Sequence, residues 1–149
     1  MGGDTLIVFN DHEYAAQIAA RAGMVFNPAV DRCIARTGAD GALLGGVIYN
    51  GYTGAAMNIH IAAFSSVWIN IDMLWVCFHY PFVQLNLSKL VGQVPSTNSI
   101  ALEFDLKIGF KEEARVKDVF PDGDLVIVSM RREDCKWLKL RPRYLKEHV

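Results

Sequence analysis

The sequence has few cysteines, no long apolar run and no excess of one charge. Its three cysteines show no CxxC spacing, so we expect three reduced thiols rather than a disulfide framework or a structural zinc site. The richest apolar stretches, residues 42–49 and 73–78, are far shorter than the roughly 18 residues of a membrane span. No basic leader precedes an apolar core near the start. We therefore expect a cytoplasmic protein with no metal site and no membrane partner.

The formal net charge is −1, from 15 Lys/Arg and 16 Asp/Glu, which argues against a basic nucleic-acid binder. The charge is nevertheless lopsided. Residues 131–149 carry seven basic and three acidic side chains, a net of +4, so residues 1–130 carry eight and thirteen, a net of −5. We favour a tail that caps the sheet edge with Trp137 and Leu138 packed down. The alternative is that its cations contact phosphates of a ligand or, less plausibly, of a nucleic acid.

The remaining composition indicates one globular α+β domain over residues 1–149. Hydrophobic residues make up 52% of the chain, which excludes a disordered protein. Periodicity predicts strands at 6–10, 31–36, 42–49, 55–64, 90–94, 110–120 and 125–130, and helices at 12–22, 71–85 and 99–108. The helical crossover through 71–85 should leave strands 55–64 and 90–94 adjacent and parallel in a mixed sheet.

Three residues mark the helix boundaries and interruptions. Asp11 is a suitable N-cap and Gly23 a suitable stop for the first helix. Pro81 lies inside the second helical pattern and has no N–H for the Cys77 carbonyl. We therefore expect a kink or a break at that point.

One run resembles the GNAT (GCN5-related N-acetyltransferase) superfamily. Asn98 is followed by Ala101 three residues later, and Gly109-Phe110 opens the next strand. The stretch from Tyr80 to Leu90 resembles the helix-to-strand join of ribosomal-protein N-acetyltransferases. The resemblance extends over residues 72–135, and the whole is most similar to the small GNAT-like proteins of tailed phages and prophages.

The resemblance implies the GNAT fold: a mostly antiparallel mixed sheet with a splayed parallel strand pair, flanked by helices. It also implies an acetyl-CoA-dependent N-acetyltransferase that transfers the acyl group to a primary amine by direct attack. The pantetheine arm would pair with a strand edge, and the pyrophosphate would meet the start of the next helix. The donor-binding residues implied are Ile61, Ala62, Ala63, Phe64, Ser65, Ser66, Trp68, Asn70, Asn98 and Asp105.

The sequence departs from the family pattern in two places. The phosphate loop normally contains glycines, which permit close backbone approach to phosphate, whereas residues 65–70 contain none. Trp68 in this loop would fill space that the pyrophosphate needs. Asp105 stands where many relatives place a tyrosine that protonates the leaving thiolate. A carboxyl group is a suitable proton donor at pH 7 only if burial raises its pKa.

Two residues are the catalytic candidates. His60, on strand 55–64, is the expected base, since an imidazole with a pKa near 6.5 accepts a proton from an ammonium at neutral pH. The alternative is a half-buried histidine that is hydrogen-bonded to a neighbour. Asn98 either positions the donor, as the resemblance implies, or caps the third helix.

The surface features leave further alternatives. The aromatic cluster of Trp68, Trp75, Tyr80 and Phe82 belongs either to the core or to a homodimer face. The acidic strand at 110–120 is either a solvated face or a groove that attracts a cationic amine. The departures also favour a second functional hypothesis, a catalytically degenerate GNAT-fold interaction or assembly protein of a phage or prophage.

Overall fold

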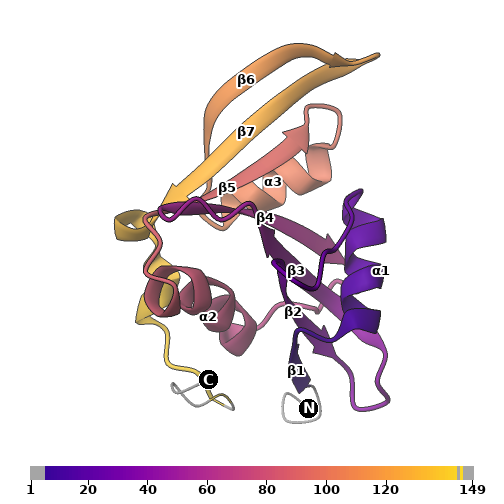
Figure 1. The fold of residues 1–149 in the computed structure, drawn as a ribbon, viewed down its shortest axis with the longest axis vertical. Helices are drawn as coiled ribbons and strands as arrows, with labels where there is room; N and C mark the ends of the chain where they lie inside the picture. Colours follow the sequence, from indigo (N-terminus) through magenta and orange to yellow (C-terminus); the bar gives the residue numbers. More distant parts are fainter. Residues whose placement is uncertain (1–5, 144, 146–149) are drawn as a thin grey trace.

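The computed structural model describes residues 6–143 and 145 and contains one seven-stranded sheet (Figure 1). Its strand order is β1-β2-β3-β4-β5-β7-β6. The strands are β1 (Leu6–Phe9), β2 (Arg32–Thr37), β3 (Leu43–Asn50), β4 (Ala56–Ala63), β5 (Lys89–Pro95), β6 (Lys111–Phe120) and β7 (Gly123–Arg131). The α-helices are α1 (His12–Ala22), α2 (Ile71–His79) and α3 (Ser99–Lys107). The element order predicted from the sequence is confirmed.

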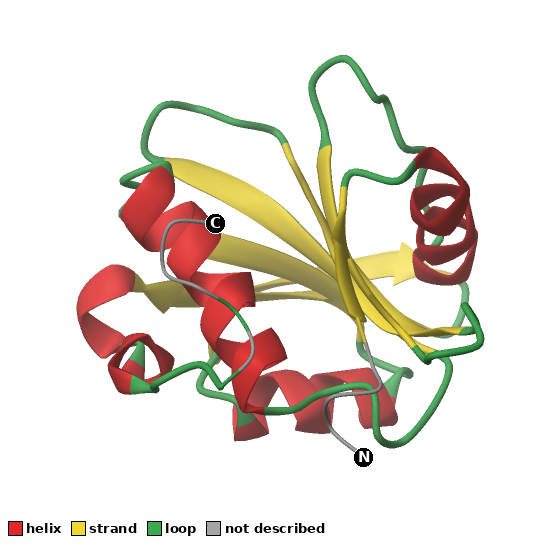
Figure 2. Ribbon diagram, turned by 90° about the horizontal axis from the view of Figure 1, so that it is seen from below, coloured by secondary structure: helices red, strands yellow, loops and turns green. Residues whose placement is uncertain are grey.

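The sheet separates two layers of helix, because its strands are apolar on both faces. Figure 2 shows α1 on one side of the sheet and the other helices on the opposite side. A small core of Ala15, Ile18 and Ile48 lies under α1. The larger core lies under α2 and α3, around Tyr49, Phe78 and other residues. No helix among the described residues is long and apolar enough to span a membrane.

Local capping fixes the ends of α1 as the sequence predicts. The Asp11 carboxylate accepts hydrogen bonds from the N–H groups of Glu13 and Tyr14, both at 3.0 Å, which satisfies two of the first turn's unpaired donors. Gly23 ends the helix in the left-handed conformation, with φ of 74°, a region that favours glycine. The last turn of α1 is therefore held at a defined place over the sheet.

The pairing of β4 with β5 is parallel, as expected, and it is short. It joins Ala56–Asn58 to Lys89–Val91 only. Beyond this point β4 stays paired with β3 as far as Ala63, and β5 stays paired with β7 as far as Pro95. Each strand is held by its outer neighbour while the two separate from each other. The sheet therefore contains a wedge-shaped gap at its centre.

Pro81 changes the helix type rather than only kinking it. The sequence predicts a helical pattern over 71–85 with a kink or a break at Pro81, and α2 ends at His79 and continues as a π-helical segment η2 (Tyr80–Gln84). The Cys77 carbonyl accepts a hydrogen bond from the buried hydroxyl of Tyr49 on β3. The proline thus removes one donor, and the sheet supplies another.

The predicted aromatic cluster lies mostly in the core. Trp68, Trp75 and Phe82 are at most 4% exposed, so they offer no homodimer face. Cys33 and Cys77 are buried free thiols, and burial raises the pKa of each to about 12. They therefore remain protonated and unreactive at neutral pH.

The C-terminal segment packs against the helices of the larger core. The 3-10 turn η4 (Lys136–Lys139) lies beside α2, and the Trp137 indole donates to the Ile108 carbonyl at 2.7 Å. Trp137 and Leu138 are partly buried against this core, beside α2, while the predicted cap over the sheet edge stays a prediction. The remainder of the predicted basic tail at 144 and 146–149 lies outside the described residues.

Replacing Tyr49 by Phe should lower the free energy of unfolding by about 1–3 kcal/mol, because the Cys77 carbonyl would lose its partner inside the core. Urea denaturation measures the change. Tyr14→Phe is the matched control, since the Tyr14 hydroxyl donates to the exposed Gly41 carbonyl, where water can replace it. Equal effects of the two substitutions would show that the Tyr49 hydroxyl does not support the helix junction.

Candidate functional site

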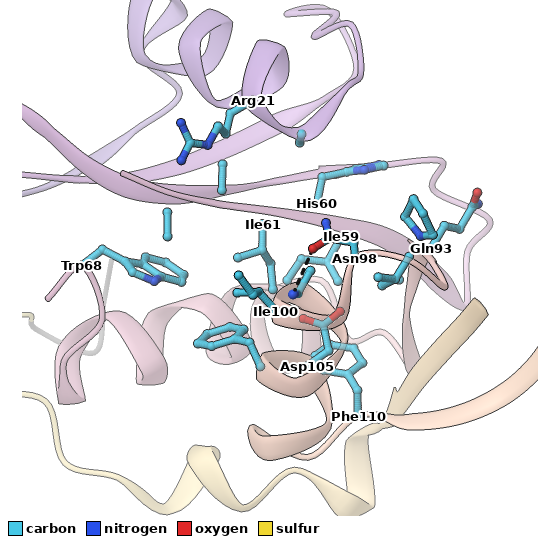
Figure 3. Close-up of a pocket in the computed structure, with 18 residues that line it drawn as sticks. Arg21, Ile59, His60, Ile61, Trp68, Gln93, Asn98, Ile100, Asp105 and Phe110 are labelled. Carbon is cyan, nitrogen blue, oxygen red and sulfur yellow. Dashed lines mark hydrogen bonds between the residues drawn. The ribbon is translucent and has the colours of Figure 1, made fainter. Parts of the chain in front are cut away.

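A cavity of about 400 Å³ occupies the gap between β4 and β5 (Figure 3). Its walls come from both strands, from the last turn of α1 and from α3. The cavity includes His60, Ile61, Ala62, Ala63, Trp68, Asn98 and Asp105 from the sequence-predicted set. A shallower hollow adjoins it and includes Phe64, Ser65 and Ser66. Asn70 lines neither.

The edge of β4 that faces the gap carries backbone groups suited to pairing with an extended ligand. The N–H of Phe64 donates to the Leu44 carbonyl of β3 at 2.9 Å. Because backbone groups alternate sides along a strand, those of Ile61 and Ala63 point the other way, toward β5. The register pairs no residue of β5 with them within the described chain. This is the edge predicted for the pantetheine arm.

His60 lies on the face of β4 that α1 covers (Figure 3). Its Nε2 atom is 3.0 Å from Asn50 Oδ1, and the side chain is half-buried. Burial lowers the pKa of His60 from its ordinary value of 6.5, and the nearby Asp31 partly opposes this. The imidazole is therefore neutral at pH 7 and able to accept a proton. The alternative interpretation, a half-buried histidine hydrogen-bonded to a neighbour, also holds, since Asn50 is that neighbour and orients the imidazole ring.

Asp105 lies on the opposite side of the gap, on α3. Its carboxyl group is close to β5, because a Cβ built on Gly92 would lie 3.9 Å from Asp105 Oδ2. The residue is 8% exposed, and burial raises its pKa from 3.8 to about 7. A substantial fraction of the carboxyl is therefore protonated at neutral pH. Burial therefore raises the pKa of Asp105 enough for its carboxyl group to act as a proton donor, the condition stated in the sequence analysis.

Asn98 caps α3 and also faces the cavity. Its Oδ1 accepts the Ala101 N–H at 3.2 Å, the dashed line in Figure 3. The capping interpretation is thus confirmed. The cap leaves the side-chain NH2 of Asn98 as a donor at the cavity wall, so the positioning role stays a prediction.

The loop after β4 is closed by an aromatic side chain. Trp68 is 4% exposed, and its ring centroid is 5.9 Å from that of Phe104. A Cβ on Gly45 would lie 2.7 Å from the indole ring, so only glycine at position 45 admits this packing. The loop is further held by Arg36, whose guanidinium donates to the Val67 carbonyl at 2.7 Å. Trp68 is thus packed into the protein at this loop, and its effect on a bound pyrophosphate stays a prediction.

The N-terminus of α2, where a ligand phosphate was expected, carries the carboxylate of Asp72. Asn70 caps the helix by accepting the Met73 N–H at 2.9 Å. Asp72, in the first turn, is 3% exposed and accepts the backbone N–H groups of Arg143 and Leu145 at 2.7 and 3.0 Å. This negative charge already occupies the positive end of the helix dipole. The basic tail thus reaches the helix start through its backbone.

Several further features bear on the predicted site. No basic side chain of the tail within 131–143 lines either cavity. The acidic strand is paired rather than open: Glu112 and Asp124 contact Arg115, and Glu113 contacts Lys89. No group of metal-ligating side chains occurs among the described residues.

Sequence reasoning missed Arg21, which lines both cavities. Its guanidinium lies 5.1 Å from the ring centroid of Phe64. The signal was available in the helical period, since Arg21 follows the fully buried Ile18 by three residues and so lies near the sheet-facing side of α1. No local sequence pattern, however, predicts that the last turn of α1 lies beside the end of β4.

The buried Asp105 makes stability depend on pH. Folded Asp105 has the higher pKa, so its contribution is fully present below about pH 4 and is lost as pH rises through about 7. Asp105→Asn should therefore flatten the decline in unfolding free energy between about pH 4 and 7, by a few kcal/mol at most. Urea denaturation at several pH values measures this.

Glu103→Gln supplies the matched control for this measurement, since Glu103 is an exposed acid on the same helix. Parallel pH profiles for the wild type and Asp105→Asn would contradict the raised pKa.

No protein-family model and no curated protein matches the sequence. Solved structures do match, and among them are spermidine N-acetyltransferases of Vibrio cholerae. One in complex with CoA and spermine is 14% identical, with a TM-score of 0.69 over 92% of this chain and 99% of that one. A dodecameric form is 14% identical, with a TM-score of 0.69 over 88% and 95%. A complex with manganese ions is 15% identical, with a TM-score of 0.67 over 88% and 94%. At these identities the likeness shows the fold, and the chain has the GNAT fold that its sequence resembles.

Proposed function

We propose that the protein is an acetyl-CoA-dependent N-acetyltransferase that acts on a primary amine. The observation that carries the proposal is the cavity between the separating strands, with a neutral imidazole on one face and a protonatable carboxyl on the other. A structurally similar protein has been solved with CoA and a polyamine bound. Acetyl-CoA is a cytoplasmic metabolite, so the proposal includes a cytoplasmic location.

The donor would lie in the gap on the α2 and α3 side. The backbone edge of Ile61–Phe64 would pair with the amide-bearing arm as an added strand. Ser65 and Ser66 would face its phosphates from the shallower hollow, and the Asn98 NH2 would donate to the acyl end. The acceptor amine would enter from the α1 face, where His60 lies.

Each step of the transfer has a residue placed for its proton. His60 takes the proton of the ammonium, and the free amine nitrogen then attacks the thioester carbonyl carbon. This attack forms the C–N bond of a tetrahedral intermediate, whose collapse breaks the C–S bond while the nitrogen releases its second proton to water. Asp105 in its protonated form donates to the departing thiolate sulfur. The products are the N-acetylated amine and CoA with a free thiol.

The second candidate is a GNAT-fold protein without transfer chemistry, an interaction or assembly module of a phage or prophage. The buried Trp68 and the carboxylate of Asp72 favour it, since both stand near the place where a pyrophosphate would bind. A homodimer, the alternative considered for the aromatic cluster, would need another surface, because Trp68, Trp75 and Phe82 are buried.

Calorimetric titration with acetyl-CoA, followed by an acetyl-transfer assay over a panel of amines, separates the two functions. We expect binding at micromolar concentrations and release of CoA thiol that depends on the amine. Absence of binding at high micromolar acetyl-CoA, together with a stable complex with another protein, would establish the second candidate instead.

His60→Gln should lower kcat by roughly 10²–10⁴-fold, the usual contribution of a general base, and leave acetyl-CoA affinity within about twofold. The wild-type rate should also fall as pH drops below the lowered pKa of His60. His12→Gln, at the exposed start of α1, is the matched control and should keep the wild-type rate. Unchanged turnover in His60→Gln would remove His60 from the mechanism.

A further inference from the structure

We propose that Arg21 selects the acceptor, and that the substrate is an amine carrying a carboxylate several bonds away rather than a polyamine. This inference rests on the proposed function and names the substrate class of the same site.

Arg21 stands on the α1 side of the gap, where it lines both the cavity and the shallower hollow. Figure 3 shows Arg21 and His60 on one side of β4, with Trp68, Asp105 and Phe110 on the other. The guanidinium lies over the Phe64 ring, 5.1 Å from its centroid, which holds a flexible side chain by a cation–π contact. Arg21 therefore projects a positive charge over the far end of β4, beyond His60.

The charges that line the cavity favour an anion on this face. The titratable side chains of its described lining are Arg21, His60 and Asp105. His60 is neutral at pH 7, and Asp105 is partly protonated and lies across the gap. Arg21 is thus the one full charge among the described residues that line the cavity on this face, and Asp31, which acts on His60, lies outside that lining. A polyamine needs carboxylates to bind its second ammonium, whereas this face would repel it.

Arg21 is also available to a ligand. Among the described residues no carboxylate forms an ion pair with it, while Arg115 and Lys89 near the acidic strand are paired. Guanidinium binds carboxylate in a planar, two-bond geometry. An acceptor with a carboxylate would therefore complete a site that the protein leaves open.

Strand geometry sets the length of the acceptor. His60 and Phe64 are four residues apart on one face of β4 and its extension, or about 13 Å at roughly 3.3 Å per residue. We take this backbone span, less about 3 Å for a hydrogen bond at each end, as the scale of the acceptor, which gives about 7 Å between its amine and its carboxylate. An extended chain of five or six bonds has this length, as in 6-aminohexanoate or the side-chain amine of free lysine.

Three acceptors of equal length test the selection in the acetyl-transfer assay: 6-aminohexanoate, hexylamine and 1,6-diaminohexane. They carry a carboxylate, a methyl group and an ammonium at the far end. We expect kcat/KM to fall in that order, by about tenfold at each step. Arg21→Gln should abolish the preference, Arg21→Lys should keep part of it, and Arg21→Glu should favour the diamine.

Arg131→Gln is the matched control, because Arg131 is an exposed arginine paired with Glu133 at the end of β7, away from the cavity. Equal kcat/KM for the three acceptors in the wild type, or an unchanged order in Arg21→Gln, would overturn the inference.

A comparison of two acyl donors shows whether Arg21 binds the carboxylate of the acceptor or the phosphates of CoA. S-acetylpantetheine carries the thioester without phosphates. If Arg21→Gln raises KM for acetyl-CoA several-fold but not for S-acetylpantetheine, with acceptor preference intact, Arg21 binds the donor and the inference fails. We expect equal KM ratios for the two donors.

A binding measurement tests the inference even if no acceptor is acetylated, which would refute the proposed function alone. Titration of the wild type with 6-aminohexanoate should shift the NMR signal of the Arg21 Nε–H. The corresponding affinity should fall about tenfold in Arg21→Gln. Equal binding of 6-aminohexanoate by both proteins would show that Arg21 does not recognise the carboxylate.

Discussion

The separation of β4 from β5 is the constraint on which the rest of the structure depends. Beyond the short parallel pairing, each strand is paired on its outer side, β4 with β3 and β5 with β7, which holds the two apart. Their facing edges therefore offer backbone groups to a ligand, since unpaired buried backbone groups are costly. The cavity, the opposed His60 and Asp105, and the access from both faces all follow from this separation.

Burial then sets the chemistry of the gap. The same loss of solvation acts in opposite directions on a base and an acid: it lowers the pKa of His60 and raises that of Asp105. Both groups are thereby neutral in part or in full near pH 7, which suits a reaction that removes one proton and supplies another. The loop at residues 65–70, beside the gap, contains no glycine. It is held instead by the packing of the Trp68 ring on Gly45.

The sequence predicts the elements well because their signals are local. Alternation of apolar residues places β4 with His60 on one face, and Asp11 and Gly23 fix α1 through contacts within a few residues. The interruption at Pro81 was predicted, but the Tyr49 hydroxyl that satisfies the Cys77 carbonyl was not, since it lies 28 residues away. Arg21 over Phe64 and the tail amides on Asp72 are likewise contacts between distant segments, and no local pattern encodes them.

The most direct test of the account is whether CoA pairs with the open edge of β4. Amide-proton NMR should show the N–H groups of Ile61 and Ala63 shifted and protected from exchange on addition of CoA, while those of Phe64 and Ala62, which face β3, change little. Unchanged exchange at Ile61 and Ala63 at saturating CoA would contradict the assignment of this gap as the donor site.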